Sequence, residues 1–524
     1  MDFLNSEQKQ VFKEALKRNK VGLSLPLGFG KTLLSLVLSQ NIEGKTMIVV
    51  SKTLVHSWLF EIEKFYKDTL KVKVFHPDFK NQPEDYDILI TTPQVLVKGY
   101  HQNDIENYFV SEIQSSNFPY TFCNYYKSSK KPFIKLNART HSFLYSTKWG
   151  SLFIDEAQQY TNINTLACKA IGSISADKRY CLSGTLFTEP NPERILGYCI
   201  LLNDTFVPRN LPGCKTRISL KTFNGLNSTL IARSPKPLKV SISNHFITSE
   251  LTDIEKKIYT SFKNLIVNLQ LLIRQNPGLQ RILGAQMLAM ITYLRQSVVN
   301  CMIPLTSSLV DISNVRNKEN LSQKILEQIN KIPNIQNYLD TVDNIKSSRF
   351  KKVLSTLNVH KSERCILFSC FRTVLDLLSS FIKDRPVFEI TGKMKIQSRN
   401  IILQEFKNSS NGILLLTYQI GAEGLNLQFC KNLLLVDFYW NDGKTKQAIG
   451  RIYRNGQERN VDVYYFISNT GIENGLFEKM KIKNVLLKEL ETGPLKTKRH
   501  KLKMSDIIKI ISEYENKNKY KEIK

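Results

Sequence analysis

The chain has 524 residues, of which 42% are hydrophobic and 23% charged, the balance of a globular protein whose length suffices for two or three domains. Lysine and arginine exceed aspartate and glutamate by 74 to 46, which gives a formal net charge of +28. This excess favours a polyanionic partner, most simply nucleic acid, while charge that only keeps the chain in solution is an equally weighted alternative.

The nine cysteines are scattered and form no C-x-x-C pair, which argues against a zinc module or a disulfide framework and favours a reducing compartment. The first residues, MDFLNSEQKQ, are polar and give no sign of a signal peptide. No apolar run approaches the length that spans a bilayer. We therefore expect an intracellular protein without a membrane partner.

Strands and helices alternate through the first part of the chain. We expect a helix over 6–17 capped by Ser6, a helix over 32–40, and another whose apolar face carries Trp58. Buried strands are expected at 21–25, 47–50, 87–92, 151–154 and 179–182. This alternation predicts a parallel, doubly wound sheet, with the polar and lysine-rich residues 100–148 as a surface insertion.

The turn between the first strand and the next helix reads G-F-G-K-T and supplies Gly28, Gly30, Lys31 and Thr32. Such a turn directs backbone N–H groups and a helix N-terminus at one point, which suits phosphate. Lys31 would then reach the outer phosphates of a nucleotide, and the Thr32 hydroxyl would hold a magnesium ion. Leu25 stands at the first glycine position of the full phosphate-loop pattern, so a plain glycine-rich turn stays open as an alternative.

Asp155 and Glu156 directly follow the strand expected over 151–154. Two carboxylates at the carboxyl end of a buried strand are costly unless a ligand uses them, and ligands bind at that edge of a parallel sheet. Together with the glycine-rich turn they predict a site in which Asp155 orients magnesium and Glu156 polarises an attacking water. A helix cap formed by Asp155 is the alternative. The segment Ser183-Gly184-Thr185 offers hydroxyls for sensing a γ-phosphate, or is a simple turn.

The pattern changes to helices between about 250 and 345, without a strand, and predicts a helical insertion. Strands and helices then alternate again. Strands are expected at 365–369, 387–392, 412–417 and 432–440, with helices at 374–382 and 398–406 between them. This second half predicts another α/β domain, which has no phosphate loop of its own.

Gln447, Arg451 and Arg454 recur at a spacing of three to four residues and are predicted to share one face of a helix. Two arginines facing a cleft suit the charge that develops during phosphoryl transfer, where an arginine acting in trans is worth roughly 10³–10⁵ in rate. An exposed basic helix face is the alternative. One lobe with a phosphate loop and one with arginines imply catalysis when a cleft closes, which is the layout of a motor.

These segments resemble the motifs of superfamily 2 helicases and translocases, and within them the SWI/SNF-like branch. The resemblance runs in order from Leu4 to Phe466 and rests on these segments: LNSEQKQVF, GFGKT, IVVSKTLVHSWLFEIEKF, ILITTPQVL, DEAQ, LSGTLFTEP, MITYLRQSVVNCMIP, ITGKMKIQSRNIILQEF, LTYQIGAEGLNLQ, VDFYWN and QAIGRIYRNGQ. It implies two RecA-like parallel-sheet lobes with a helical insertion between them. The expected parts are an N-terminal ATP-binding lobe over 1–245, the insertion over 246–345, a C-terminal lobe over 346–490 and a basic tail over 491–524.

The resemblance further implies ATP and Mg²⁺ as cofactors, with Gln8 on the adenine and catalytic roles for Lys31, Asp155, Glu156, Arg451 and Arg454. Five residues would couple the state of the nucleotide to the track, the nucleic acid along which the motor moves: Gly421, Glu423, Gly424, Asn426 and Gln447. Of these, Gly424 and Gln447 would also bind the nucleotide. The nucleic acid would lie along Lys52, Thr92, Ser369, Gly392, Asn426 and Trp440. Such contacts go mostly to phosphates and are therefore weakened by salt.

The chain departs from the branch at several positions, including Gln158 where histidine is usual and Ser51 where proline is usual. Its short form and its lysine-, asparagine- and isoleucine-rich composition are similar to the versions of large DNA viruses. The expected location is therefore the nucleus or cytoplasm, or a virion or viral factory.

We predict an ATP-dependent motor that moves along double-stranded DNA, with transcription or replication proteins as further partners. Three alternatives stay open at this point. The first is a strand-separating helicase on DNA or RNA. The second is a DNA-dependent ATPase subunit of a transcription complex, and the third is a catalytically weak subunit that bridges such a complex. For the basic tail, a solvated end and an added nucleic-acid contact are the two readings.

Overall fold

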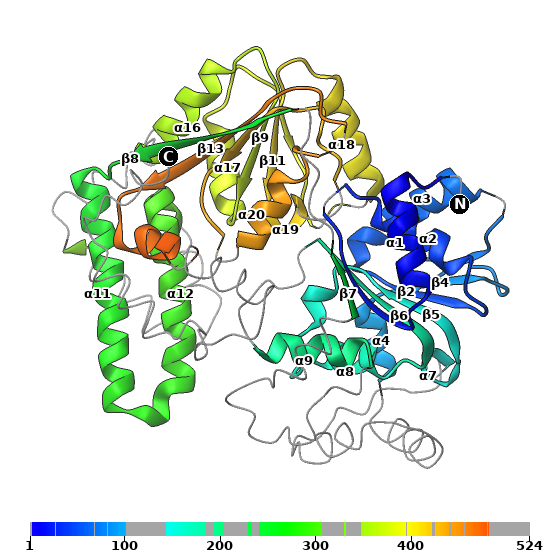
Figure 1. Ribbon diagram of the computed structural model, residues 1–524. Helices are drawn as coiled ribbons and strands as arrows, with labels where there is room; N and C mark the ends of the chain where they lie inside the picture. The colour runs from blue at the N-terminus through cyan, green and yellow to red at the C-terminus, as the bar shows by residue number, and fades with distance from the viewer. Residues whose placement is uncertain are drawn as a thin grey trace. The chain divides into compact units, whose positions relative to one another are not determined.

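The computed structural model describes residues 3–26, 28–67, 69–80, 82–100, 143–184, 192–203, 229–232, 240–305, 330–331, 347–392, 394, 396–421, 425–439, 442–454, 456–478 and 480. The chain divides into two compact units, which meet in sequence between Pro237 and Leu238. Each unit is built on its own parallel sheet, labelled in Figure 1.

The first unit contains a seven-stranded sheet in the order β3-β4-β2-β5-β6-β1-β7, and every neighbouring pair is parallel. Its strands are β1 (Lys20–Ser24), β2 (Thr46–Val49), β3 (Val72–Phe75), β4 (Ile88–Thr91), β5 (Trp149–Ile154), β6 (Ala176–Ser183) and β7 (Leu230–Ala232). Its helices are α1 (Ser6–Leu16), α2 (Lys31–Ser39), α3 (Val55–Tyr66), α4 (Pro93–Gly99), α7 (Phe143–Ser146), α8 (Leu166–Gly172) and α9 (Pro192–Leu201), with single 3₁₀ turns at η1 (Lys52–Leu54) and η3 (Ala157–Tyr160).

Successive side chains of the central strands enter two different cores. Met47 and Val49 of β2 pack on one face of the sheet, with α4, α8 and α9, while Ile48 packs on the other face, with α1, α2 and α3. Strands β2, β4 and β5 are buried along their whole length, as expected of parallel strands that are covered on both faces. This arrangement confirms the predicted doubly wound sheet.

The second unit contains a six-stranded parallel sheet in the order β10-β11-β9-β12-β13-β8. Its strands are β8 (Ile242–Ser249), β9 (Cys365–Ser369), β10 (Val387–Glu389), β11 (Ile413–Thr417), β12 (Asn432–Leu435) and β13 (Val461–Ser468). Around it lie α16 (Ser348–Val359), α17 (Arg372–Ser380), α18 (Ile396–Asn408), α19 (Tyr418–Gly421) and α20 (Asp442–Ile449). The second α/β lobe is thereby confirmed.

The predicted helical insertion forms a hairpin of α11 (Asp253–Gln275) and α12 (Gln280–Val299), joined through η4 (Pro277–Leu279) and packed side by side (Figure 1). The two helices share an apolar core that also takes in Ile472, so the hairpin belongs to the second unit. The third expected helix, around 319–329, lies outside the described residues, as do most of 100–148 and the whole of 491–524.

Two details differ from the sequence predictions. Strand β8 pairs with β13 over its eight residues, so the expected lobe boundary between 245 and 246 runs through a strand of the second sheet. Asn5, and not Ser6, caps α1, because its side chain accepts from the backbone N–H of Gln8 while the Gln8 side chain accepts from the Asn5 N–H.

Within the part of the chain that the structure describes, no helix is long and apolar enough to cross a membrane.

Candidate nucleotide and nucleic-acid site

The glycine-rich turn lies between β1 and α2, at the carboxyl edge of the first sheet. Gly28 and Gly30 adopt φ angles of +81° and +84°, in the left-handed region that glycine enters without strain. Gly30 is the N-cap of α2 and has no side chain to form a cap hydrogen bond, and the N-terminus of a helix is a favourable place for an anion. The turn therefore has the backbone of an anion-binding loop.

Two side chains hold this loop. The Lys31 ammonium donates to the backbone oxygens of Leu25 and Pro26, at 3.0 and 3.3 Å. Gln8 donates from Nε2 to the backbone oxygen of Phe29 at 2.7 Å, and thereby fastens α1 to the loop. The resemblance places Gln8 on an adenine, and the structure adds this direct contact with the phosphate loop.

Asp155 and Glu156 follow β5, which is separated from β1 only by β6 in the sheet. Asp155 is buried and accepts hydrogen bonds from the indole N–H of Trp58 and from the backbone N–H of Glu156, both at 2.9 Å. Burial, and then the neighbouring charge of Glu156, raise the pKa of Asp155 to about 6, against the opposing charge of Lys31. The predicted gathering of Lys31, Asp155 and Glu156 at one sheet edge is thus present.

The backbone at Glu156 is strained, because this non-glycine residue has a φ of +49°. Gln158, which stands where the branch usually has histidine, donates from Nε2 to the Glu156 carboxylate. The Oε1 atom of Gln158 is buried and has no hydrogen-bond partner. Gln158 therefore fixes the carboxylate that the sequence assigns to water activation.

The arginine motif differs from its prediction. Helix α20 ends at Ile449, just before Gly450, so Arg451 and Arg454 lie in the turns that follow it. The expectation that they share one helix face with Gln447 is wrong, because glycine is a poor helix former and the backbone oxygen of Arg451 instead accepts from the N–H of Leu427 at 3.2 Å. Arg451 is buried, whereas Gln447 and Arg454 are half-buried.

Two of the expected track residues are buried. The Ser369 hydroxyl donates to the carboxylate of Asp437, and neither side chain is exposed. Thr92 is the N-cap of α4, where its Oγ1 atom accepts from the backbone N–H of Val95 at 3.4 Å. These two hydroxyls are committed to the protein itself.

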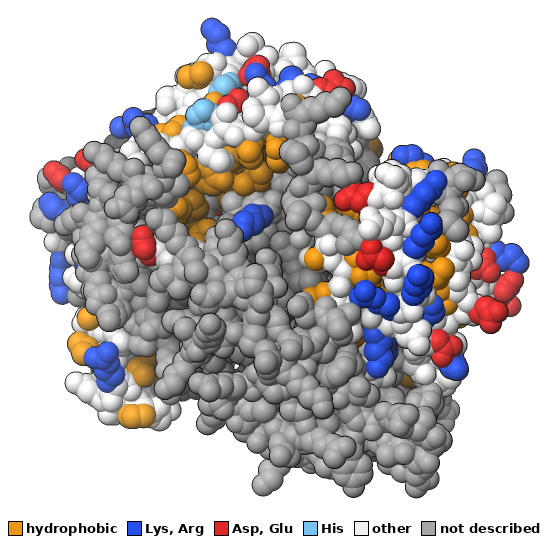
Figure 2. Space-filling view, in the orientation of Figure 1, with side chains coloured by type: hydrophobic (Ala, Val, Ile, Leu, Met, Phe, Trp, Pro, Cys, Tyr) orange, Lys and Arg blue, Asp and Glu red, His pale blue; other side chains and the backbone are white. Residues whose placement is uncertain are grey.

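The other expected track residues are accessible or lie outside the described residues. Lys52, on η1, is half exposed and forms an ion pair with Asp78. Asn426 is exposed, and a Cβ atom added at Gly392 would meet nothing within 4 Å. Gly424 and Trp440 lie outside the described residues. Figure 2 shows a band of lysine and arginine side chains on the first unit, flanked by aspartate and glutamate.

Sequence reasoning missed two groups that shape these edges. Trp58 was predicted as an apolar helix residue, but its N–H serves Asp155. Asp437, within the quoted segment VDFYWN, is buried, and burial raises its pKa. Its position directly after the run NLLLV, at the end of β12, is the same signal that identified Asp155.

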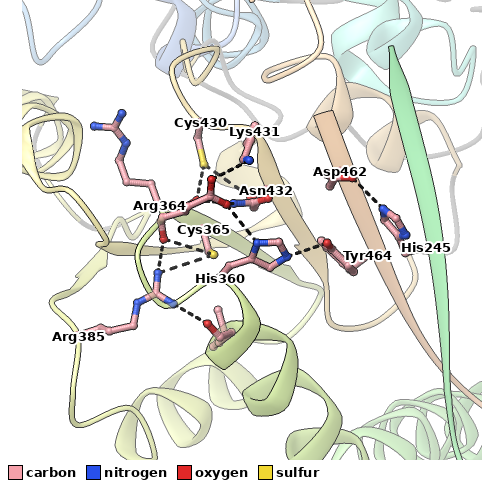
Figure 3. Close-up of polar contacts among 12 residues, drawn as sticks. His245, His360, Arg364, Cys365, Arg385, Cys430, Lys431, Asn432, Asp462 and Tyr464 are labelled. Atoms are coloured by element: carbon pink, nitrogen blue, oxygen red, sulfur yellow. Dashed lines mark hydrogen bonds and ion pairs between the residues drawn. The ribbon is translucent and has the colours of Figure 1, made fainter. Parts of the chain in front are cut away.

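Figure 3 shows a different group of polar contacts, at the amino ends of β9, β12 and β13. Glu363 accepts from Lys431 at 2.7 Å, from Asn432 at 3.0 Å and lies 3.2 Å from Nδ1 of His360. Burial alone would raise the pKa of Glu363, but these three contacts outweigh it and lower the pKa to about 2. Nε2 of the same histidine lies 2.7 Å from the Tyr464 hydroxyl.

Both arginines of this group donate to backbone carbonyl oxygens, and Figure 3 shows such contacts for Arg385. Arg385 donates to the oxygens of Asn411 and Leu357 at 2.8 and 2.9 Å, and Arg364 donates to the oxygen of Ser409 at 3.1 Å. Ligands of parallel sheets bind at the opposite edge. This cluster is therefore a frame that holds the loops of the amino edge.

Comparison with known proteins identifies both units. Residues 8–196 match the SNF2-related domain, residues 346–456 match the Helicase conserved C-terminal domain, and together these matches take in more than half of the chain. The chain is 27% identical over 541 residues to "Putative helicase 172L" of Invertebrate iridescent virus 6, which covers 92% of this chain and 87% of that protein.

Two further similarities are more limited. The chain is 30% identical over 144 residues to "DNA repair and recombination protein RAD54" of Oryza sativa subsp. japonica, which covers 27% of this chain and only 15% of that protein. Among solved structures, the SWI2/SNF2 ATPase core of Sulfolobus solfataricus in complex with dsDNA is 19% identical and covers 94% of this chain and 93% of that one, with a TM-score of 0.37.

Proposed function

The chain belongs to the SNF2-related family of helicases and translocases, and from that membership we propose that it hydrolyses ATP in order to move along double-stranded DNA. The observation that carries the proposal is the carboxyl edge of the first sheet. There a loop with two left-handed glycines stands one strand away from a buried pair of carboxylates.

The donor set fits a nucleotide. The N-terminus of α2, the left-handed backbone at Gly28 and Gly30, and the Lys31 ammonium all favour phosphate oxygens. Lys31 now donates to two backbone oxygens, which a phosphate would replace with a stronger charge-assisted partner. ATP would be held by this loop, with Gln8 fixing the loop from α1.

Mg²⁺ fits the same edge. Magnesium is usually bound by one or two carboxylates together with phosphate oxygens, and Asp155 with the Thr32 hydroxyl supplies the protein's share. Among the described residues no group of three or more His, Cys, Asp or Glu side chains could hold a metal, which suits an ion completed by the nucleotide. The ion would supply charge neutralisation, and Glu156, fixed by Gln158, would polarise the attacking water.

We also propose nucleotide roles for three residues of the second lobe, with Gln447 binding the nucleotide and Arg451 and Arg454 stabilising charge on the transferred phosphoryl group. Their place in the matched helicase C-terminal domain supports this assignment. We keep Gly424 as a nucleotide residue and Trp440 as a track residue on the resemblance of their segments alone. The lobes are assigned to 1–237 and 238–482 in accord with the compact units.

Double-stranded DNA is proposed as the track, contacted through phosphates. The accessible Lys52, Gly392 and Asn426 support direct contacts, whereas the buried Ser369 and Thr92 support a role in shaping the loops that make them. The net charge of +28 suits a phosphate track. Proteins of transcription or replication, and an added contact from the basic tail, stay part of the proposal.

The test is steady-state ATP hydrolysis at low salt without polymer and with duplex DNA, single-stranded DNA or RNA. We expect duplex DNA to give the strongest stimulation and Glu156→Gln to lose hydrolysis while it retains nucleotide binding. Hydrolysis no faster than that of Lys31→Ala contradicts the motor. Stronger stimulation by a single strand favours the strand-separating helicase, and indifference to all polymers favours a subunit that works within a larger complex.

A further inference from the structure

The segment that leaves β12 is held by its backbone. Three consecutive carbonyl oxygens each accept a hydrogen bond from the side chain of a different helix: Val436 from Arg349 of α16 at 3.2 Å, Asp437 from Tyr418 of α19 at 2.8 Å, and Phe438 from Arg295 of α12 at 2.6 Å. The carboxylate of Asp437 accepts in addition from the Ser369 hydroxyl and from the Cys370 N–H. This segment is therefore fixed directly ahead of the proposed track residue Trp440.

Arg295 contacts the exits of two neighbouring strands, as Arg349 does at Val436 and Ser468, but Arg295 does so from the helical hairpin. Its Nη2 atom, which binds Phe438 after β12, also lies 3.4 Å from the sulfur of Cys370 after β9. Its guanidinium group lies 5.1 Å above the centre of the Phe371 ring. A planar group with five donors can satisfy such a set, whereas a lysine ammonium cannot.

The helical hairpin has other attachments to the second sheet. Glu255 of α11 accepts from the backbone N–H and the hydroxyl of Ser348, at 3.0 and 2.6 Å. Tyr259 accepts from the backbone N–H of Ile472 at 3.2 Å, and the Ser347 hydroxyl donates to the oxygen of Val299 at 2.8 Å. The hairpin is thus fastened independently of Arg295, whose contacts go to the strand exits.

We propose that Arg295 is a positioning residue of the motor: it fixes the exits of β9 and β12 relative to each other and ties them to the helical hairpin, so that the loop residues behind them engage the track. The inference rests on the proposed function, because it assigns a task to the same track loops. It also gives a role to the segment MITYLRQSVVNCMIP, which the nucleotide chemistry leaves unused. Misplacement of a positioned group by about 1 Å can cost roughly 10²-fold in rate.

The test compares Arg295→Gln with the unaltered chain by ATP hydrolysis over a range of duplex DNA concentrations. We expect the DNA concentration for half-maximal stimulation to rise and stimulated turnover to fall by roughly tenfold. Hydrolysis without DNA should change less than twofold, because the contacts of Arg295 described above go to the exits of β9 and β12. Arg274→Gln, an exposed arginine near the end of α11, is the matched control and should behave like the unaltered chain.

Arg295→Lys keeps the charge and most of the packing, and it serves if the glutamine variant unfolds. We expect it to recover part of the stimulation. Full stimulation in Arg295→Lys and Arg295→Gln overturns the inference, as does an equal loss with and without DNA. If the unaltered chain itself responds to no polymer, then it is the proposed function that fails.

Discussion

Two carboxylates at two sheet edges show opposite environments. At the carboxyl edge of the first sheet, Asp155 is buried beside Glu156, and its pKa is raised to about 6. At the amino edge of the second sheet, Glu363 receives hydrogen bonds from three side chains, and its pKa is lowered to about 2. At the first edge, burial and the charge of Glu156 outweigh the charge of Lys31 and the hydrogen bond from Trp58, whereas at the second edge the contacts with Lys431, Asn432 and His360 outweigh burial.

The difference teaches that a dense polar network need not mark a site. The cluster of Figure 3 has many partners and is closed on itself, since its arginines end on backbone carbonyls. The proposed nucleotide edge instead combines a helix without a side-chain cap, left-handed glycines and a strained Glu156. Backbone strain and buried carboxylates of this kind cluster at functional sites, where binding of a ligand offsets their free-energy cost.

Asp155→Asn should give the largest effect and separate activity from stability. Loss of the proposed magnesium ligand should lower hydrolysis by at least roughly 10²-fold. Removal of a buried charge whose burial cost outweighs its favourable contacts should at the same time raise the free energy of unfolding at pH 7 by about 1 kcal/mol. Steady-state hydrolysis and urea unfolding measure the two quantities, and a less stable variant contradicts the comparison.

Glu363→Gln should lower stability and leave hydrolysis unchanged, the opposite of the effects expected for Asp155→Asn. It removes a carboxylate that Lys431 and Asn432 bind, so we expect the free energy of unfolding at pH 7 to fall by about 1–2 kcal/mol, after allowance for solvent screening. DNA-stimulated hydrolysis per folded molecule should be unchanged. Glu405→Gln, an exposed carboxylate on α18, is the matched control. A selective loss of hydrolysis would show that the amino edge takes part in catalysis.

Gly30→Ala tests the strained loop. The new Cβ would lie 2.6 Å from Nε2 of Gln8 at a φ of +84°, so we expect a loss of stability of about 1 kcal/mol and weaker nucleotide binding. Gly284→Ala, in α12, meets nothing within 4 Å and should be neutral or slightly stabilising. Thermal unfolding and nucleotide titration distinguish the two. Equal behaviour of both variants would contradict the proposed backbone requirement.

The smallest effect is the pH dependence of unfolding. The pKa of Asp155 is about 6 in the folded chain and near 3.8 in the unfolded chain. Its contribution to the free energy of unfolding is therefore fully present below about pH 3.8 and is lost as the pH rises through 6. Glu363 titrates at about 2 when folded and near 4.5 otherwise, so its contribution is present above 4.5 and is lost as the pH falls toward 2. Asp155→Asn should flatten the first limb, and Glu363→Gln the second.

Most of the central strands could be predicted because they are apolar runs buried on both faces. The strands that were missed are β3, β7, β8 and β13. The first three lie at the edges of their sheets, and β13, although interior, alternates buried and half-buried residues at its start and pairs with β8 from more than 200 residues further along the chain. The lobe boundary at 245 was misplaced for the same reason. Pairing between distant segments leaves no local pattern in a single sequence.

The gathering of Lys31 with Asp155 and Glu156 could be predicted because the carboxyl ends of the strands of one parallel sheet lie along the same edge. Contacts that depend on packing could not: Gln8 reaches the loop, Trp58 reaches Asp155 and Arg295 reaches Phe438 only in the folded chain. The shared helix face of Gln447 and the arginines failed because residue spacing cannot show where a helix ends. Ser369 was assigned by resemblance, and its burial follows from its pairing with Asp437.

The hydrogen bond between Trp58 and Asp155 gives the protein an optical probe of the proposed nucleotide site. Of the three tryptophans, Trp58 of α3 donates to Asp155 after β5, whereas Trp149 begins that strand and donates to the oxygen of Leu144. A cation that takes up the Asp155 charge alters the field at the first indole and leaves the second unchanged. In a Trp440→Phe background, ultraviolet emission would therefore follow each loading of the site in real time, without a dye.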